Sequence, residues 1–210
     1  MNLTARTTPH SVDSAQLAAL APLTRGLQQL VERHGLDQDL LGRYHDSIEH
    51  YFESAGSQDS PEKENSPSSQ PWGWQPALEG PELSMGTLTV FQHEDIPLHD
   101  HPGSIGLLIV LQGKVKVCSY RLAEEPGQYQ PSPLELEQTG AVELVPGEYV
   151  HFGPGENNIH SLQAIDGDCV LFDILFYPYQ LQQRSFYMPV TPQTSTGSVY
   201  VSRLNKFFAN

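Results

Sequence analysis

Two histidines one residue apart form the stretch of the chain that is most suggestive of chemistry, "IPLHDHPGS" over residues 96–104. In an extended segment, residues i and i+2 point to the same face, so His99 and His101 should project together while Asp100 points away. Prolines close to each histidine restrict the backbone, so the pair loses little conformational entropy on binding a ligand. The pattern indicates a metal site. The alternative is two surface histidines on a strand, since the chain has nine histidines.

A later glycine and a later histidine extend this pattern. Gly113 follows the run "SIGLLIVLQ", and His160 begins another apolar run after the turn in "GPGENNIHSLQA". This arrangement resembles the two motifs of cupin proteins, in which the first motif ends in Gly and the second supplies one more His. The usual cupin first motif has a glutamate ligand seven residues before that Gly, and here Gly106 stands at that position. The resemblance therefore implies a site of three neutral histidines: His99, His101 and His160.

The missing carboxylate has a chemical meaning. Two histidines and a carboxylate give iron one negative ligand, whereas three imidazoles leave the whole +2 charge on the metal. We expect such a site to favour an anionic ligand from the substrate, for which a thiolate is a good candidate. His151, just before "FGPGENNIH", could be the third ligand instead, but His160 has the position after the turn that a cupin ligand takes.

A closer resemblance rests on four segments taken in order: "IPLHDHPG", "GLLIVLQGKVKVCSY", "NNIHSLQAI" and "LFDILFYPY". They resemble the cysteamine dioxygenase and plant cysteine oxidase family of thiol dioxygenases, and "GLLIVLQG" is most similar to the animal type. The resemblance implies an Fe(II) cofactor and a reaction that adds both atoms of dioxygen to a thiol, giving a sulfinate. The implied substrates are cysteamine and the N-terminal cysteine of a peptide, because their amine and thiolate can chelate iron together. Oxygen affinity would decide between oxygen sensing and thiol metabolism.

The same resemblance suggests residues around the metal. Asp173 matches the family aspartate in "DILFYPY" and is expected to hydrogen-bond a metal-bound ligand or the substrate amine, unless it is a structural capping carboxylate. Tyr179 and Tyr187 match family tyrosines and could line the pocket or belong to the core. Ser185 stands where the animal enzymes have the Cys of a Cys-x-Tyr motif, so a Cys–Tyr crosslink cannot form from that pair.

Short apolar runs broken by Gly and Pro begin at about Leu83 and predict strands. They are "LSMGTLTVFQ", "IGLLIVLQG", "KVKVCSYRL", "AVELVPGEYVHFG", "IHSLQAI" and "CVLFDILFY". Many short strands with turns between them indicate an all-β sandwich or barrel, and the resemblance narrows this to the cupin double-stranded β-helix. Cys118 and Cys169 lie in such runs and are expected to be buried, reduced thiols, with a disulfide as the alternative.

An N-terminal helical segment should precede the barrel. Residues 14–54 have the periodicity of a helical hairpin packed on the barrel, with a separate partner-binding module as the alternative. The apolar residues of its first face are Leu20, Leu23, Leu27, Leu30 and Val31. Residues 55–71 are rich in Ser, Pro and Glu and are expected to form a flexible linker or loop. Residues 72–210 would then be the cupin thiol dioxygenase domain.

The formal net charge of −14 argues against nucleic acid or an anionic membrane as a partner. No apolar run approaches the roughly 18 residues of a membrane span, and the N-terminus has no signal-peptide core. We expect a soluble, cytoplasmic monomer whose partners are a thiol and dioxygen. Two rivals remain: a cupin binding or regulatory protein with a structural metal, and a metal-dependent cupin oxygenase or isomerase acting on a non-thiol substrate. The complete histidine triad disfavours the first, and the missing glutamate with "DILFYPY" disfavours the second.

Overall fold

The structure is a computed structural model that describes residues 14–34, 38–55, 72–80, 83–123, 133–154, 158–176, 184–190 and 197–204. The helices are α1 (Ser14–Ala19), α2 (Ala21–His34) and α3 (Gln38–Ala55). The strands are β1 (Trp72–Glu79), β2 (Leu83–Val90), β3 (Asp95–His99), β4 (Ile105–Leu122), β5 (Leu134–Leu144), β6 (Tyr149–Phe152), β7 (Ile159–Phe176), β8 (Phe186–Pro189) and β9 (Ser198–Leu204). Residues 56–71 of the predicted linker, and Tyr179, lie outside the described residues.

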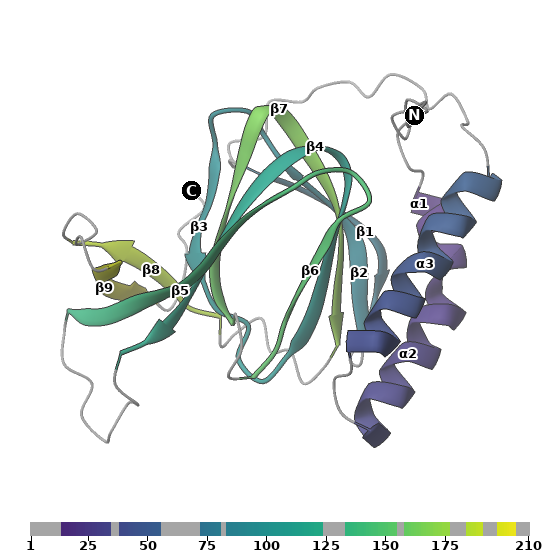
Figure 1. Cartoon of the computed structure of the whole chain (residues 1–210), viewed down its shortest axis with the longest axis horizontal. Coiled ribbons are helices and arrows are strands. Elements are labelled where there is room, and N and C mark those ends of the chain that lie inside the picture. The colour runs from purple at the N-terminus through teal and green to yellow at the C-terminus, as the bar shows by residue number, and fades with distance from the viewer. Residues whose placement is uncertain are drawn as a thin grey trace, which may run out of the picture.

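Two long strands, β4 and β7, pair antiparallel over nearly their whole length and form the scaffold of the barrel (Figure 1). Six strands close a ring in the order β7-β3-β8-β9-β5-β4 and back to β7. The other half of β7 carries β2 and then β1, and the first half of β4 carries β6. This arrangement confirms the predicted all-β class, with a double-stranded β-helix and an N-terminal helical segment.

Each of the two long strands was predicted as two separate strands, and the structure joins them. The pairing of β4 with β7 shifts register on either side of Gln112, and Gly113 has a φ of +79°. A Cβ at Gly113 would collide with the carbonyl oxygen of Asp168 on β7. The glycine that interrupts the apolar pattern therefore bends a continuous strand where two backbones meet closely, rather than ending it.

The alternation along β4 explains why helices cover one face of the sheet. Leu107, Ile109 and Leu111 belong to the apolar cluster that contains the helices, whereas Leu108 and Val110 belong to the cluster inside the barrel. Successive side chains of a strand point to opposite faces, so one strand supplies both layers. Figure 1 shows α1 and α2 following one another, with α3 beside them, along the β1 and β2 side of the barrel.

The buried face of α2 differs from the predicted one. Leu20, Leu27 and Val31 are buried, but Leu23 is 39% exposed and Leu30 is 40% exposed. A helix docked on a sheet buries the stripe that faces it directly, and Leu23 and Leu30 lie on the flank of that stripe. Thr24 lies between Leu20 and Leu27 on the buried stripe of the helix. Its Oγ1 is 2.6 Å from the Tyr44 hydroxyl of α3.

The two cysteines are free thiols, as predicted. Cys169 is buried, but Cys118 is only half-buried, which corrects the expectation for that residue. Its neighbours Val115 and Val117 point into the barrel, so the alternation of β4 turns Cys118 outward. No helix among the described residues is both long and apolar enough to cross a membrane.

The bend at Gly113 leads to a stability prediction. Gly113→Ala adds a methyl group that meets the β7 backbone and forces a positive φ on alanine, so we expect the free energy of unfolding to fall by about 2–4 kcal/mol. Gly140→Ala is the matched control, because nothing lies within 4 Å of a Cβ there. Urea unfolding should separate the two variants. Equal midpoints would contradict the steric role assigned to Gly113.

Candidate metal centre

Three buried histidines converge inside the barrel. The potential ligand atoms of His99, His101 and His160 all lie within 4.8 Å of one another. The ring centroids are 4.8 Å apart for His99 and His101, 4.6 Å for His99 and His160, and 5.2 Å for His101 and His160. The side chains are only 2–3% exposed. Three imidazoles this close, away from water, form a donor set that suits a divalent transition metal.

Strand pairing brings His99 and His160 together. His99, the last residue of β3, stands directly opposite His160 on β7 in the antiparallel register. His101 lies just beyond the end of β3, yet its ring still turns to the same side as His99. The predicted i, i+2 projection is therefore correct. His151, the alternative third ligand, is buried on β6 but is not a member of this described group.

A backbone contact sets the tautomer of His99. Its Nδ1 lies 2.8 Å from the carbonyl oxygen of Pro97. A carbonyl oxygen can only accept, so Nδ1 carries the proton and Nε2 keeps the lone pair that a metal needs. Burial holds the pKa of His99 well below its usual range, and the neighbouring His160 and Arg184 lower it further. The pKa of His101 is lowered for the same reasons, with burial first and Arg184 next.

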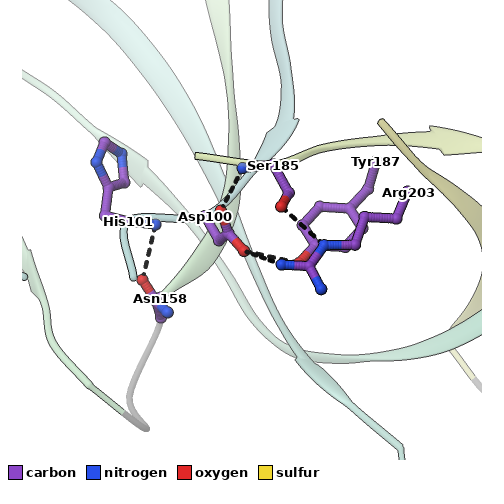
Figure 2. Close-up of polar contacts among 6 residues, drawn as sticks. All are labelled: Asp100, His101, Asn158, Ser185, Tyr187 and Arg203. Atoms are coloured by element: carbon purple, nitrogen blue, oxygen red, sulfur yellow. Dashed lines mark hydrogen bonds and ion pairs between the residues drawn. The ribbon is translucent and has the colours of Figure 1, made fainter. Parts of the chain in front are cut away.

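Asp100 points away from the rings, as predicted, and is anchored on β8 and β9 (Figure 2). Its carboxylate accepts hydrogen bonds from the Ser185 backbone N–H at 2.6 Å and from the Tyr187 hydroxyl at 2.8 Å. Its own N–H donates to the Ser185 carbonyl at 3.1 Å, and Arg203 approaches the carboxylate at 3.9 Å. The next N–H, that of His101, donates to Oδ1 of Asn158 at 2.9 Å. Hydrogen bonds to Ser185 and to Asn158 thus hold the backbone at Asp100 and His101 in place.

The hydrogen bond to Asp100 also fixes the position of Tyr187. This residue was expected either to line the pocket or to belong to the core. Its buried hydroxyl points to Asp100, and the residue is not among the described residues that line the cavity. Burial, followed by the Asp100 charge, raises the pKa of Tyr187. A buried phenol needs a hydrogen-bond partner, and Asp100 supplies it outside the cavity. Ser185, at the position of the family cysteine, accepts a hydrogen bond from Nε of Arg203 at 2.7 Å.

The position of the usual cupin glutamate is closed by an aromatic ring. Gly106 pairs with Phe152 of β6, and a Cβ on Gly106 would stand within the Phe152 ring. The centroid of that ring is 4.7 Å from the centroid of His101 and 4.8 Å from that of His160. The predicted absence of a fourth protein ligand thus coincides with an apolar side chain in the space it would need.

The histidines open into a cavity of about 200 Å³. Its wall is largely aliphatic and aromatic, with a carboxyl and a guanidinium placed inside. The lining residues besides the three histidines are Trp72, Trp74, Glu79, Ser84, Leu88, Ile96, Leu108, Phe152, Leu162, Asp173, Leu175 and Arg184. A small apolar cavity with a few convergent polar groups is typical of a site for a small ligand.

Asp173 is the carboxyl that the sequence indicated, and it lies on β7 in the cavity wall. Burial raises its pKa to about 7, against a smaller opposing effect of Arg184. Its Oδ1 has no hydrogen-bond partner among the described residues. A buried carboxyl oxygen that the protein leaves unsatisfied is suited to a partner supplied by a ligand.

Arg184 was not predicted as a site residue. Its Nη2 lies 3.3 Å from both ring nitrogens of His101, and its Cζ lies 6.0 Å from the centroid of the Phe186 ring. The contact with His101 spans 83 residues of sequence, so no local pattern could reveal it. The one signal available was a basic residue immediately before the "SFYMP" run.

Comparisons with known proteins agree with this geometry. The family model described as PCO_ADO matches residues 43–206. "2-aminoethanethiol dioxygenase" of Mus musculus is 30% identical over 140 residues, covering 55% of this chain and 55% of the relative. The protein of the same name from Homo sapiens is 30% identical over 117 residues, covering 46% and 43%. The chain thus spans about half the length of these curated relatives.

Among solved structures, a conserved protein with a double-stranded beta-helix domain from Klebsiella pneumoniae aligns with a TM-score of 0.40 at 14% identity, covering 52% of this chain and 75% of that one. The family match is far more extensive, because it runs from α3 through every strand to beyond β9 and includes all three clustered histidines and Asp173. The chain belongs to the PCO_ADO family.

Proposed function

We propose that the protein is a non-haem Fe(II) thiol dioxygenase that converts a thiol into a sulfinate with dioxygen. The observation that carries this proposal is the buried cluster of His99, His101 and His160, which includes no carboxylate among the described residues and opens into a small cavity. Membership of the PCO_ADO family and the names of the two mammalian relatives support the same reaction class.

The residues present fit an iron ion. Three neutral imidazoles would hold it on one face, and the proton on Nδ1 of His99 leaves Nε2 for the metal. When bound, the iron would supply the centre at which thiolate and dioxygen meet. The chain excludes water around that centre with Phe152 and aliphatic side chains, which strengthens electrostatic interactions within the cavity.

The substrate we propose is an aminothiol, such as cysteamine or the N-terminal cysteine of a peptide. Oδ1 of Asp173 is suited to hydrogen-bond the amine, because it lies in the cavity with no other partner among the described residues. Tyr187 acts through Asp100 on the backbone that carries the histidines, which makes it a positioning residue. A role for Tyr179 in the pocket stays a prediction. We further propose that the protein acts as a monomer in the cytoplasm.

The reaction is tested directly on small thiols. Protein loaded anaerobically with Fe(II) is exposed to air with cysteamine, and in a separate reaction with a peptide that begins with Cys. The mass of each product is measured by mass spectrometry. We expect a gain of two oxygen atoms on at least one thiol, and we expect His160→Ala to lose both bound iron and product.

His151→Ala is the matched histidine control and should retain iron, because His151 lies outside the cluster. An iron-replete protein that leaves both thiols at their original mass would refute the proposed reaction. Iron retained by His160→Ala but lost by His151→Ala would instead show that the third ligand was wrongly assigned.

The raised pKa of Asp173 predicts the pH dependence of stability in the metal-free protein. Its pKa is about 7 when folded against an ordinary value of 3.8, so the folded state disfavours ionisation. Below pH 4 the carboxyl is neutral in both states and costs nothing. As pH rises from about 4 to about 7, the folded protein should lose up to about 4 kcal/mol relative to Asp173→Asn, and the loss should level off above that range. Unfolding by urea at pH 5 and pH 8 in the presence of a chelator measures this. If the free energy of unfolding changed with pH by the same amount in the wild type and in Asp173→Asn, the predicted effect of Asp173 would be wrong.

A further inference from the structure

The strand β1, at one end of the sheet, forms the mouth of the cavity. Trp72, Trp74 and Glu79 of this strand line the same cavity as the three histidines. Trp74 is 37% exposed and Glu79 is exposed, whereas the histidines are buried. The cavity therefore has an inner end at the candidate metal centre and an outer end at an indole and a carboxylate.

A β-bulge turns Glu79 toward the cavity. Successive side chains of a strand point to opposite faces, so a residue five positions after Trp74 would ordinarily face away from it. The register of β1 against β2 shifts after Pro76, which adds one residue to β1 and restores the phase. Trp74 pairs with Leu88 of β2. Glu79 pairs with Ser84, and both of these β2 partners line the cavity. Bulges beside functional sites commonly redirect a side chain in this way.

Trp74 and Glu79 form one unit at the mouth. The indole Nε1–H donates a hydrogen bond to Oε1 of Glu79 at 3.2 Å. Gly86 of β2 lies against the ring, because a Cβ at that position would stand 2.8 Å from Cη2 of Trp74. The glycine leaves room for the indole to lie close to the β2 backbone, and the hydrogen bond holds the carboxylate at the edge of the ring.

A second carboxyl group lies on the same face, two strands away. Gly86 pairs with Pro76 of β1 on one side and with Asp173 of β7 on the other. Neighbouring strands are about 4.8 Å apart, so roughly 10 Å separates the backbones of β1 and β7 at this level. Glu79 and Asp173 are the two carboxyl groups among the described residues that line the cavity. The cavity thus offers one carboxyl inside and one at its mouth.

An indole face with a carboxylate at its edge favours a long basic side chain. The aliphatic stem of Lys or Arg packs on the ring, and the charged head reaches the carboxylate. An acidic side chain would instead meet a like charge at Glu79. The formal net charge of −14 adds a long-range attraction for cationic ligands. The guanidinium of Arg184 lies at the inner end of the cavity, 3.3 Å from His101.

We propose that Trp74 and Glu79 form a subsite for the second residue of a peptide that begins with cysteine, and that this subsite prefers a basic side chain. The inference rests on the proposed function and narrows its substrate class. With the cysteine amine at Asp173, one residue of extended backbone covers about 3.5 Å of the distance toward β1. The flexible four-carbon stem of Lys suits the remainder. Cysteamine ends before this subsite and cannot use it.

The rival explanation is that Trp74 only covers the edge of the barrel and that Glu79 only satisfies the indole N–H. That explanation gives the mouth no preference for the charge of a ligand. The two explanations separate on three peptides that differ in the second side chain alone: Cys-Lys-Ala-Ala, Cys-Met-Ala-Ala and Cys-Glu-Ala-Ala. Each peptide is amidated, which removes the charge of its C-terminus.

The activity experiment measures kcat/KM of the iron-loaded protein for each peptide. We expect the wild type to favour the Lys peptide over the Glu peptide by about tenfold or more, with the Met peptide between them. Glu79→Gln should bring that ratio close to one, and Trp74→Leu should lower it in part. Glu79→Lys should invert the ratio in favour of the Glu peptide. A residue with only a structural role would not produce that inversion.

Binding provides a second measurement that needs no turnover. Isothermal titration calorimetry on the iron-loaded protein under anaerobic conditions gives a dissociation constant for each peptide. The preference for the Lys peptide, and its loss in Glu79→Gln, is expected in these constants too. Glu94→Gln is the matched control, because Glu94 is exposed, carries the same charge and is not among the described residues that line the cavity. It should keep the wild-type ratio.

Each outcome decides one proposal or both. Equal kcat/KM values for the Lys and Glu peptides in the wild type, or a ratio that Glu79→Gln and Glu79→Lys leave unchanged, overturn the subsite while the dioxygenase reaction stands. A ratio that falls equally in Glu94→Gln assigns the preference to overall charge and also overturns the subsite. Tighter binding of the Lys peptide that depends on Glu79, with no oxygen added to any thiol, supports the subsite and overturns the reaction. Binding of none of the peptides overturns both. If Trp74→Leu fails to fold, the two Glu79 variants decide.

Discussion

The antiparallel register of β3 against β7 is the constraint on which the candidate site depends. His99 stands opposite His160, and a slip of one residue would turn one of them to the other face of the sheet. The first half of β7 is paired on its other edge with β4, from Ile159 opposite Tyr120 to Ile165 opposite Lys114. A strand held along both edges cannot slide. The same strand continues to Asp173, beyond two shifts of register against β4, so one strand carries both a metal-ligand candidate and the carboxyl of the cavity.

Asp100 extends this constraint to the rest of the site. A buried carboxylate is costly unless it is fully hydrogen-bonded, and Ser185 and Tyr187 satisfy it. Two hydrogen bonds, from the Asp100 N–H to the Ser185 carbonyl and from the Ser185 N–H to the Asp100 carboxylate, bring the residue before β8 against the turn that carries His101. Arg184 precedes Ser185 by one residue and is thereby placed on His101. The anchor that holds the backbone of His101 thus also places the guanidinium of Arg184 beside the ring of that histidine.

Local patterns predicted the parts of this protein that repeat along the chain, and missed the parts made by distant contacts. Alternation identified the strands, the i, i+2 spacing of His99 and His101 predicted that they project together, and the resemblance to the cupin motifs added His160. The length of β4 and β7 was missed because a glycine is a breaker in isolation, but a bend when another backbone packs against it, as at Gly113. Arg184 and the partner of Tyr187 depend on β8 returning to β3, and no period or spacing encodes that return.

The neutral character of the histidine cluster is a property of two residues rather than of one missing glutamate. Gly106 and Phe152 face each other across β4 and β6, and the ring fills the space that any side chain at Gly106 would enter. A glycine facing a void would allow water, or a side chain introduced by a single substitution, to bind the metal. The ring instead lies against His101 and His160, so a side chain at position 106 has no room to add its charge to a metal bound there. A metal held by three imidazoles alone would keep its full charge until an anionic ligand binds, which is why this neutral cluster fits the thiolate ligand proposed above.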